Sequence, residues 1–239
     1  MSESQQDVRD SIRSAKLFVD LPPPLVDQLA ISSRIRALSS GEVLFHQGDP
    51  ASTYYLLQSG AIRLVQHTAD GKDVTIATFG ADDLIGLLVA LNGDPYPATA
   101  EVLSDSVVIA FGSSAIWDAM NQHAPLAVRV LRLMGSRLHE AHDRIRELSV
   151  ERVQQRIARS LVRLASKVGV KQPDGSIYLD LRLSRQDLAQ MNGTTLETVS
   201  RTLTGWQKAG IVDSGREHIT ILAPHRLVLI AEDADEHNL

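Results

Sequence analysis

Residues 184–203 read SRQDLAQMNGTTLETVSRTL, and this stretch predicts two short helices joined by a tight turn. Ser184 is a favourable N-cap for the first helix, and Asp187 three residues later suits its first turn. The Asn192-Gly193 pair provides a turn that needs a positive φ, which glycine adopts readily. The stretch is therefore typical of a helix-turn-helix.

The second helix is expected to begin after Thr194 or Thr195, either of which can cap it. Its inner face is predicted to consist of Leu196, Val199, Leu203 and Trp206. The following residues, KAGIVDSGREHITIL, indicate a hairpin with Ser214-Gly215 at its tip. A helix-turn-helix followed by such a wing is a design that reads double-stranded DNA.

Glu197, Ser200 and Arg201 lie at helical spacing on the side opposite the predicted inner face. Arginine can donate two hydrogen bonds to guanine, glutamate can accept one from cytosine, and serine can serve a base edge or a phosphate. We therefore interpret this face as base-reading. The alternative is a surface Glu–Arg pair of the i,i+4 kind, worth a few tenths of a kcal/mol.

The charge of the chain is unevenly distributed. The whole protein carries a formal net charge of −5. Residues 151–221 contain 11 Lys and Arg against 7 Asp and Glu, a net of +4, whereas the remainder has 13 against 22, a net of −9. A basic C-terminal third in an acidic protein favours a local nucleic-acid-binding module. The alternative is an uneven surface without function.

Residues 41–111 differ from the rest of the chain in composition and in the spacing of their glycines. Short runs such as EVLFHQGD, YYLLQSGAIRLVQH and DVTIATFG are rich in Val, Ile, Leu and aromatic residues and are separated by glycine-containing turns. The pattern predicts short antiparallel strands in a barrel or sandwich. TADGKDV is the strongest hairpin turn among them.

Residues 114–150 predict a long helix with an apolar seam. Its members are spaced alternately four and three residues apart, as in a coiled coil: Ala127, Leu131, Met134, Leu138, Ala141, Ile145 and Leu148. This strict period favours a homodimer interface. The alternative is an intramolecular core helix, which usually shows a wider apolar stripe.

Several classes of protein are excluded by what the sequence lacks. It has no cysteine, so disulfides and cysteine-ligated iron–sulfur clusters are ruled out. It has neither a phosphate-binding loop nor a zinc-protease motif, and no nucleophile–base pairing is evident, so we do not expect an enzyme. It has no long apolar run and no signal-peptide pattern, and we expect a cytoplasmic protein without a membrane partner.

Residues 15–225 resemble the cyclic-AMP-receptor/fumarate-nitrate-reductase-regulator family of bacterial transcription factors. The stretches GEVLFHQGDPASTYYLLQSGAIRL and SRQDLAQMNGTTLETVSRTL carry the resemblance. It implies an α+β fold with a jelly-roll (cupin-like) effector domain over residues 1–120 and a dimerisation helix over 121–150. A winged helix-turn-helix domain with an acidic tail would occupy 151–239.

The resemblance also implies roles for individual residues. The ETVSR motif at 197–201 is similar to the oxygen and nitric-oxide branch of the family. It implies an inverted repeat of TTGAT-type half-sites, with Arg201 on the guanine, Glu197 on the opposite cytosine or an adjacent base, and Ser200 on the thymine side. It further implies RNA polymerase as a partner and DNA backbone contacts by Ser184, Arg185, Gln186 and Thr195.

Family members that bind cyclic AMP hold it with a Gly-Glu pair and an Arg-Ser pair. Here Gly86-Leu87 and Pro97-Ala98 stand in their places, and Ala141 and His142 replace the hydroxyl residues expected next to the adenine. A buried phosphate without its arginine would be uncompensated. We therefore do not expect a cyclic nucleotide as effector. A regulatory module of a kinase or channel that binds such a nucleotide is the less favoured alternative.

The remaining segment predicts an apolar effector pocket next to the long helix. Its expected lining is Leu84, Ile85, Leu87, Leu88, Val89 and Leu91, together with Leu138, His139 and His142. The chain resembles in particular a cysteine-free, nitric-oxide-responsive subgroup of denitrification regulators, which implies haem with His139 or His142 as its ligand. The alternatives are a different small apolar ligand, no ligand, and histidines with ordinary hydrogen-bonding roles.

Overall fold

The computed structural model describes residues 3–69, 71, 73–215 and 217–233. The chain folds into two compact units, which are described separately here: residues 1–62 with 79–142, and residues 63–78 with 143–239. Residues 234–239 of the predicted acidic tail, and residues 70 and 72 of the predicted TADGKDV turn, lie outside the described residues.

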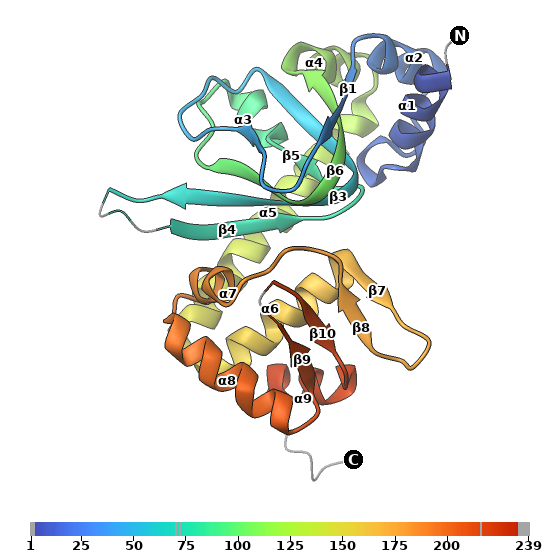
Figure 1. The fold of residues 1–239 in the computed structure, drawn as a ribbon. Helices are drawn as coiled ribbons and strands as arrows, with labels where there is room; N and C mark the ends of the chain where they lie inside the picture. Colours follow the sequence, from blue (N-terminus) through green and yellow to red (C-terminus); the bar gives the residue numbers. More distant parts are fainter. Residues whose placement is uncertain (1–2, 70, 72, 216, 234–239) are drawn as a thin grey trace. The chain divides into compact units, whose positions relative to one another are not determined.

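The first unit begins with helices that pack at one end of a β-structure (Figure 1). Helix α1 (Glu3–Ser14) and the short 3-10 helix η1 (Lys16–Phe18) precede α2 (Pro23–Ile31). Proline at the first position of α2 suits a helix start, because the fixed φ of the ring matches the helix and its missing N–H has no partner there anyway. Phe18 and Phe111 meet in the core with ring centroids 6.2 Å apart.

The strands form an antiparallel sheet of order β1-β6-β3-β4, with β2 paired to β6 and β5 paired to β3. The predicted antiparallel strands are therefore present, but β3 and β6, with 15 and 14 residues, are not short as predicted. Strand β6 is the centre of this sheet, and Ile35 of β1 lies opposite Ile109 of β6. The strands are β1 (Arg34–Leu38), β2 (Val43–Phe45), β3 (Thr53–His67), β4 (Asp73–Phe79), β5 (Leu84–Ile85) and β6 (Thr99–Gly112).

Three helices follow or interrupt the strands: α3 (Leu87–Asn92), α4 (Ser113–Gln122) and the long α5 (Ala124–Val150). The predicted long helix is present over Ala124–Val150, but residues 114–122, also predicted to belong to it, lie in the separate helix α4, which is capped by His123. Leu126 and Val130 of α5 are buried in the same hydrophobic core as α1, α2 and α4. Helix α5 is continuous across the boundary of the two units, which falls between His142 and Asp143. No helix in the described part of the chain is long and apolar enough to span a membrane.

The second unit contains the predicted winged helix-turn-helix. Helices α7 and α8 (orange in Figure 1) lie next to each other, and strand β9 packs against α8. Helix α6 packs against α9 and α7, and a sheet of order β7-β8-β10-β9 completes the unit. The elements are α6 (Val153–Val168), β7 (Gly169–Lys171), β8 (Ile177–Leu179), α7 (Arg185–Asn192), α8 (Leu196–Lys208), β9 (Val212–Ser214), β10 (Ile219–Ile221) and α9 (Pro224–Glu232).

Candidate DNA-binding surface and effector region

Helix α7 begins with a reciprocal capping box. The Ser184 hydroxyl accepts a 3.1 Å hydrogen bond from the Asp187 N–H, and the Asp187 carboxylate accepts a 2.8 Å bond from the Ser184 N–H. Arg63, which belongs to the same compact unit, forms an ion pair with Asp187. Burial would raise the pKa of Asp187, but the hydrogen bonds from Ser184 and Arg63 outweigh it and hold that pKa below its ordinary value.

The turn between α7 and α8 depends on Gly193. This residue has φ +55°, in the left-handed region, and a Cβ placed on it would lie 3.3 Å from Cδ2 of Leu148. The predicted need for a positive φ is therefore confirmed, and the close approach of Leu148 is a second restriction at the same position. Asn192, predicted only as a turn residue, is fully buried with its amide hydrogen-bonded to Leu188 and Ser160.

Helix α8 starts at Thr195, whose hydroxyl accepts a 3.2 Å hydrogen bond from the Thr198 N–H. Val199, Leu203 and Trp206 are buried, as predicted. Leu196 is 47% exposed, so its assignment to the inner face was wrong. The first turn of α8 extends beyond the core, and the buried stripe instead includes Thr202, whose hydroxyl donates to the Thr198 carbonyl oxygen.

The residues predicted to read bases lie at the N-terminal end of α8. Glu197 and Arg201 are exposed on the first two turns of α8, and Ser200 is half-buried between them. None of the ion pairs within the described residues joins Glu197 to Arg201. The two side chains therefore do not form the surface Glu–Arg pair of the alternative interpretation. The Glu197 carboxylate and the Arg201 guanidinium both belong to exposed side chains.

The four predicted backbone-contact residues differ in what their side chains already bind. Ser184 and Thr195 use their hydroxyls as helix caps. Arg185 is half-buried and Gln186 is exposed at the start of α7. The two hydroxyls are thus committed within the protein, whereas Arg185 and Gln186 lie at the N-terminal end of α7, where the helix dipole also favours an anion.

The predicted wing is an antiparallel hairpin of β9 and β10, in which Ser214 lies opposite Ile219. The Gly215 N–H donates a 3.0 Å hydrogen bond to the His218 carbonyl oxygen and closes the turn. Residue 216, within this turn, lies outside the described residues. The hairpin extends from the end of α8, as the helix-turn-helix-plus-wing prediction required.

The predicted seam of α5 is open to solvent in the single chain. Leu131, Leu138 and Ile145 are 65%, 56% and 63% exposed, and Met134, Ala141 and Leu148 are exposed too. The face that packs against the core of the first unit is a different one, containing Leu126, Val130 and Leu133. The seam is therefore not the face of α5 that packs into the core of the first unit, which argues against the core-helix alternative for Leu131, Met134 and Leu138.

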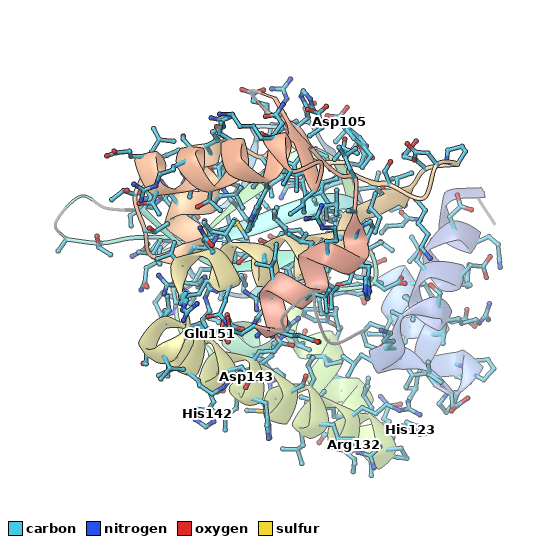
Figure 2. All side chains as sticks on the ribbon, turned by 90° about the horizontal axis from the view of Figure 1, so that it is seen from below. Asp105, His123, Arg132, His142, Asp143 and Glu151 are labelled. Atoms are coloured by element: carbon cyan, nitrogen blue, oxygen red, sulfur yellow. The ribbon has the colours of Figure 1, made fainter. Side chains whose placement is uncertain are left out.

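The predicted effector residues fall into two groups that the single chain does not enclose together. Ile85 and Leu87 are fully buried, Leu84 and Leu91 pack against the core, and Leu88 is half-buried. Leu138, His139 and His142 are exposed on α5, and Figure 2 shows His142 pointing outward from that helix.

Near the two histidines, α5 directs the side chain of Arg137 toward the connection between β4 and β5. Its guanidinium lies 5.2 Å from the centroid of the Phe79 ring and 3.6 Å from the carboxylate of Asp83. His139, two residues further on, bonds through Nδ1 to the Gly135 carbonyl oxygen of its own helix at 2.9 Å. The helix is therefore rotated so that an arginine, not the histidines, meets the β4–β5 connection.

Sequence reasoning missed a buried carboxylate and its arginine partners at the junction of α5 and α6. Glu147 is buried, and Arg144, Arg159 and Arg163 surround its carboxylate. Glu151 lies at the same junction, as Figure 2 shows. The available signal was the placement of charged residues on the inner side of α6, which reads as an ordinary amphipathic helix when only apolar spacing is considered.

Two family models match separate parts of the chain. The cyclic nucleotide-binding domain model matches residues 35–123, and the Crp-like helix-turn-helix domain model matches residues 155–230. The first match covers the strands β1 to β6, and the second covers α7, α8 and the wing.

Relatives match over most of their length. The chain is 30% identical over 189 residues to the anaerobic regulatory protein of Bacillus subtilis, covering 79% of each chain. It is 30% identical over 209 residues to the fumarate and nitrate reduction regulatory protein of Vibrio cholerae, covering 86% of this chain and 82% of that one. Among solved structures, FixK2 from Bradyrhizobium japonicum has a TM-score of 0.72 at 25% identity, covering 83% and 96%.

Proposed function

The chain belongs to the Crp/Fnr family of transcription regulators, and from that premise we propose that it binds an inverted repeat of TTGAT-type half-sites as a homodimer. The observation that carries this proposal is the exposed face of α8, where Glu197 and Arg201 lie unpaired with each other. Glu197 and Arg201 lie about one helical turn apart near the N-terminus of α8. A helix end with this arrangement can place both side chains against base edges in the major groove.

The base contacts follow from the chemistry of each side chain. The Arg201 guanidinium donates two parallel hydrogen bonds to O6 and N7 of a guanine. The Glu197 carboxylate accepts from the amino group of a cytosine, which explains an exposed acid on a surface meant for a polyanion. Ser200, half-buried between them, faces the thymine side of the half-site.

The homodimer is supported by the exposed seam of α5. A row of Leu, Met and Ile side chains at coiled-coil spacing needs an apolar partner, and a second copy of the same helix supplies one in register. Two copies of α8 would then read two half-sites about 34–36 Å apart on one side of the duplex.

For the effector, we propose a small ligand other than a cyclic nucleotide. Leu87 follows Gly86 where cyclic-AMP-binding relatives are expected to have a glutamate, and Leu87 is buried in the hydrophobic core. A nucleotide ribose at this position would meet an apolar side chain and no carboxylate. Nitric oxide bound through haem stays a prediction, with another small apolar ligand or no ligand as the alternatives.

The haem prediction can be compared with the residues present. His139 and His142 are both exposed on α5, whereas Leu87 lies in the core of the first unit and Leu84 and Leu91 pack against that core. One chain by itself therefore does not form an enclosed haem site around these histidines. An absorbance spectrum of the protein purified from cells tests the prediction, since bound haem gives a Soret band that His139→Ala combined with His142→Ala must alter.

RNA polymerase as a partner and a cytoplasmic location belong to the same proposal, because a regulator of transcription acts where the DNA is. A pull-down of the polymerase on DNA carrying the inverted repeat, with and without the protein, tests the first of these.

The proposal for DNA binding is tested by a gel shift on a duplex carrying the inverted TTGAT repeat. We expect Arg201→Ala to weaken binding by about 1–3 kcal/mol, which is about five- to 150-fold, and to relax the preference for the guanine. Lys208→Ala, in the last turn of the same helix, is the matched control and should have little effect on base preference. If the wild-type protein binds the repeat no better than a scrambled duplex, the proposal fails.

A further inference from the structure

The end of α5 holds a buried carboxylate that reaches toward α6. The Glu147 side chain is 3% exposed, and its Oε1 accepts a 2.6 Å hydrogen bond from Arg163 on α6. Its Oε2 accepts a 3.0 Å bond from Arg144, one turn earlier on α5. A buried carboxylate is stable only when its charge is paired in this way, so the geometry of the α5–α6 junction depends on these contacts.

The hydrogen bonding continues from Arg163 through α6 to the turn of the helix-turn-helix. Arg163 Nη2 donates a 3.2 Å bond to the hydroxyl of Ser160, which is 1% exposed. That hydroxyl in turn donates a 2.8 Å bond to Oδ1 of Asn192, the last residue of α7. We call the four residues Glu147, Arg163, Ser160 and Asn192 the relay. All of them belong to the same compact unit.

The Asn192 end of the relay is fixed on all sides. Its Nδ2 donates a 2.7 Å bond to the Leu188 carbonyl oxygen, and its own carbonyl oxygen accepts a 3.2 Å bond from Arg156 Nε on α6. A Cβ on the next residue, Gly193, would lie 3.3 Å from Cδ2 of Leu148 on α5, so these two residues pack closely. Two short paths, one polar and one apolar, therefore connect the end of α5 to the turn that precedes α8.

We propose that the relay makes Glu147 and Ser160 positioning residues for DNA reading, because it fixes the direction of α8 relative to residues 143–150 at the end of α5, which belong to the same compact unit. This inference rests on the proposed function of a dimer that reads two half-sites. In such a dimer the two copies of α5 are paired, so the direction of each α8 relative to its own α5 determines the half-site spacing that both can read together.

A plain packing role is the competing explanation, and the chemistry distinguishes the two. Apolar side chains of similar volume often replace buried ion pairs without loss of stability, so stability alone does not require this arrangement. A chain of directional hydrogen bonds such as the relay instead restricts orientation. Loss of one member should therefore loosen the direction of α8 more than it weakens the contacts that α8 itself makes.

The test uses the full-length protein with two relay variants and one control. Glu147→Gln keeps the shape of the side chain and removes its charge, and Ser160→Ala removes the hydroxyl in the middle of the relay. Glu140→Gln is the matched control, because Glu140 also pairs with an arginine three residues away on α5 but is exposed and outside the relay. Fluorescence anisotropy is recorded at a temperature where circular dichroism shows all four proteins folded.

The duplexes carry the inverted TTGAT repeat with the half-sites moved one base pair closer or further apart, and one duplex carries a single half-site. We expect the wild type and Glu140→Gln to prefer one spacing by about tenfold or more, and both relay variants to fall to about twofold. Affinity for the single half-site should stay within about twofold of the wild type in every variant. An unchanged spacing preference in both relay variants overturns the inference. So does an equal loss of affinity for the single half-site, which would mean a damaged α8.

Hydrogen exchange gives a reading that does not depend on DNA. Glu147→Gln and Ser160→Ala should raise exchange in peptides covering residues 186–198 by about tenfold over the wild type, and Glu140→Gln should not. If exchange is unchanged in the relay variants, the inference fails. If exchange rises but the wild type shows no preference for the repeat over scrambled DNA, the relay exists and the proposed function is what fails.

Discussion

The hydroxyl of Ser184 donates a 2.6 Å hydrogen bond to Oδ2 of Asp187, the same oxygen that accepts from the Ser184 N–H. The residue predicted to touch a DNA phosphate is thus committed first to starting α7. A phosphate at this position would meet the backbone end of the helix and the neighbouring Gln186 before it met that hydroxyl.

Ser184→Ala should lower the free energy of unfolding by about 1 kcal/mol, the usual value of an N-cap side chain. Urea denaturation followed by circular dichroism measures this. Ser166→Ala, which removes an exposed hydroxyl bonded within α6, is the control and should change it much less. The salt dependence of DNA binding should be the same as for the wild type, because no phosphate contact is lost. A shallower salt slope would assign Ser184 to the DNA after all.

The stability of the second unit should fall in acid through Glu147. Burial alone would raise the pKa of this carboxyl, but hydrogen bonds and charge from Arg163 and Arg144 hold it below its ordinary 4.5. The unfolded chain therefore takes up the proton first, so the contribution is complete above about pH 4.5 and is lost as the pH falls through the folded value.

Urea denaturation repeated across this acid range measures the effect of Glu147. In Glu147→Gln the free energy of unfolding should depend less steeply on pH below about 4.5, since one linked proton has been removed. Glu140→Gln, which changes an exposed carboxylate, should retain the wild-type slope. Identical slopes in all three proteins would contradict a depressed pKa at Glu147.

Charge placed in the α5 seam should dissociate the dimer. Leu138→Asp puts a carboxylate into a row of apolar side chains, and sedimentation should show a shift toward the single chain. Affinity for the inverted repeat should fall by about tenfold or more, because a single chain no longer carries a linked second subunit to bind the other half-site. Arg132→Asp, on an exposed position of α5 outside the seam, serves as the control. A dimer that survives Leu138→Asp unchanged would show that the seam is not the interface.

Truncation of two leucines of α8 should lower the free energy of unfolding by very different amounts. Leu203 is fully buried, so Leu203→Ala should cost about 2–5 kcal/mol of the free energy of unfolding. Leu196 is 47% exposed, and Leu196→Ala should cost less than about 0.5 kcal/mol. Thermal or urea denaturation of the two variants measures both losses and tests which face of α8 is packed against the core. Comparable losses at both sites would contradict it.

The helix-turn-helix was predictable because its signals are local. A cap at Ser184, a left-handed glycine at 193 and apolar residues at 199, 203 and 206 each act within a few residues, and the structure retains all of them. Leu196 was misplaced because helical spacing alone does not say where the core ends along a helix.

The effector region was less predictable because it depends on packing between distant segments. The rotation of α5 decides whether Arg137 or His139 meets the strands, and a coiled-coil pattern describes only one side of that helix. The relay was missed for a related reason. Its members are polar residues from three helices, and no spacing rule connects Glu147 with Asn192.

The open seam of α5 also has a consequence for how much of the regulator a cell must make. When most chains are single, the amount of dimer grows with the square of the chain concentration, as mass action requires. Promoter occupancy would then rise more steeply than the protein's own synthesis. Weak DNA sites would stay empty until the chain concentration exceeds the dissociation constant of the dimer. The set of genes under control would then depend on the expression level of the regulator as well as on its signal.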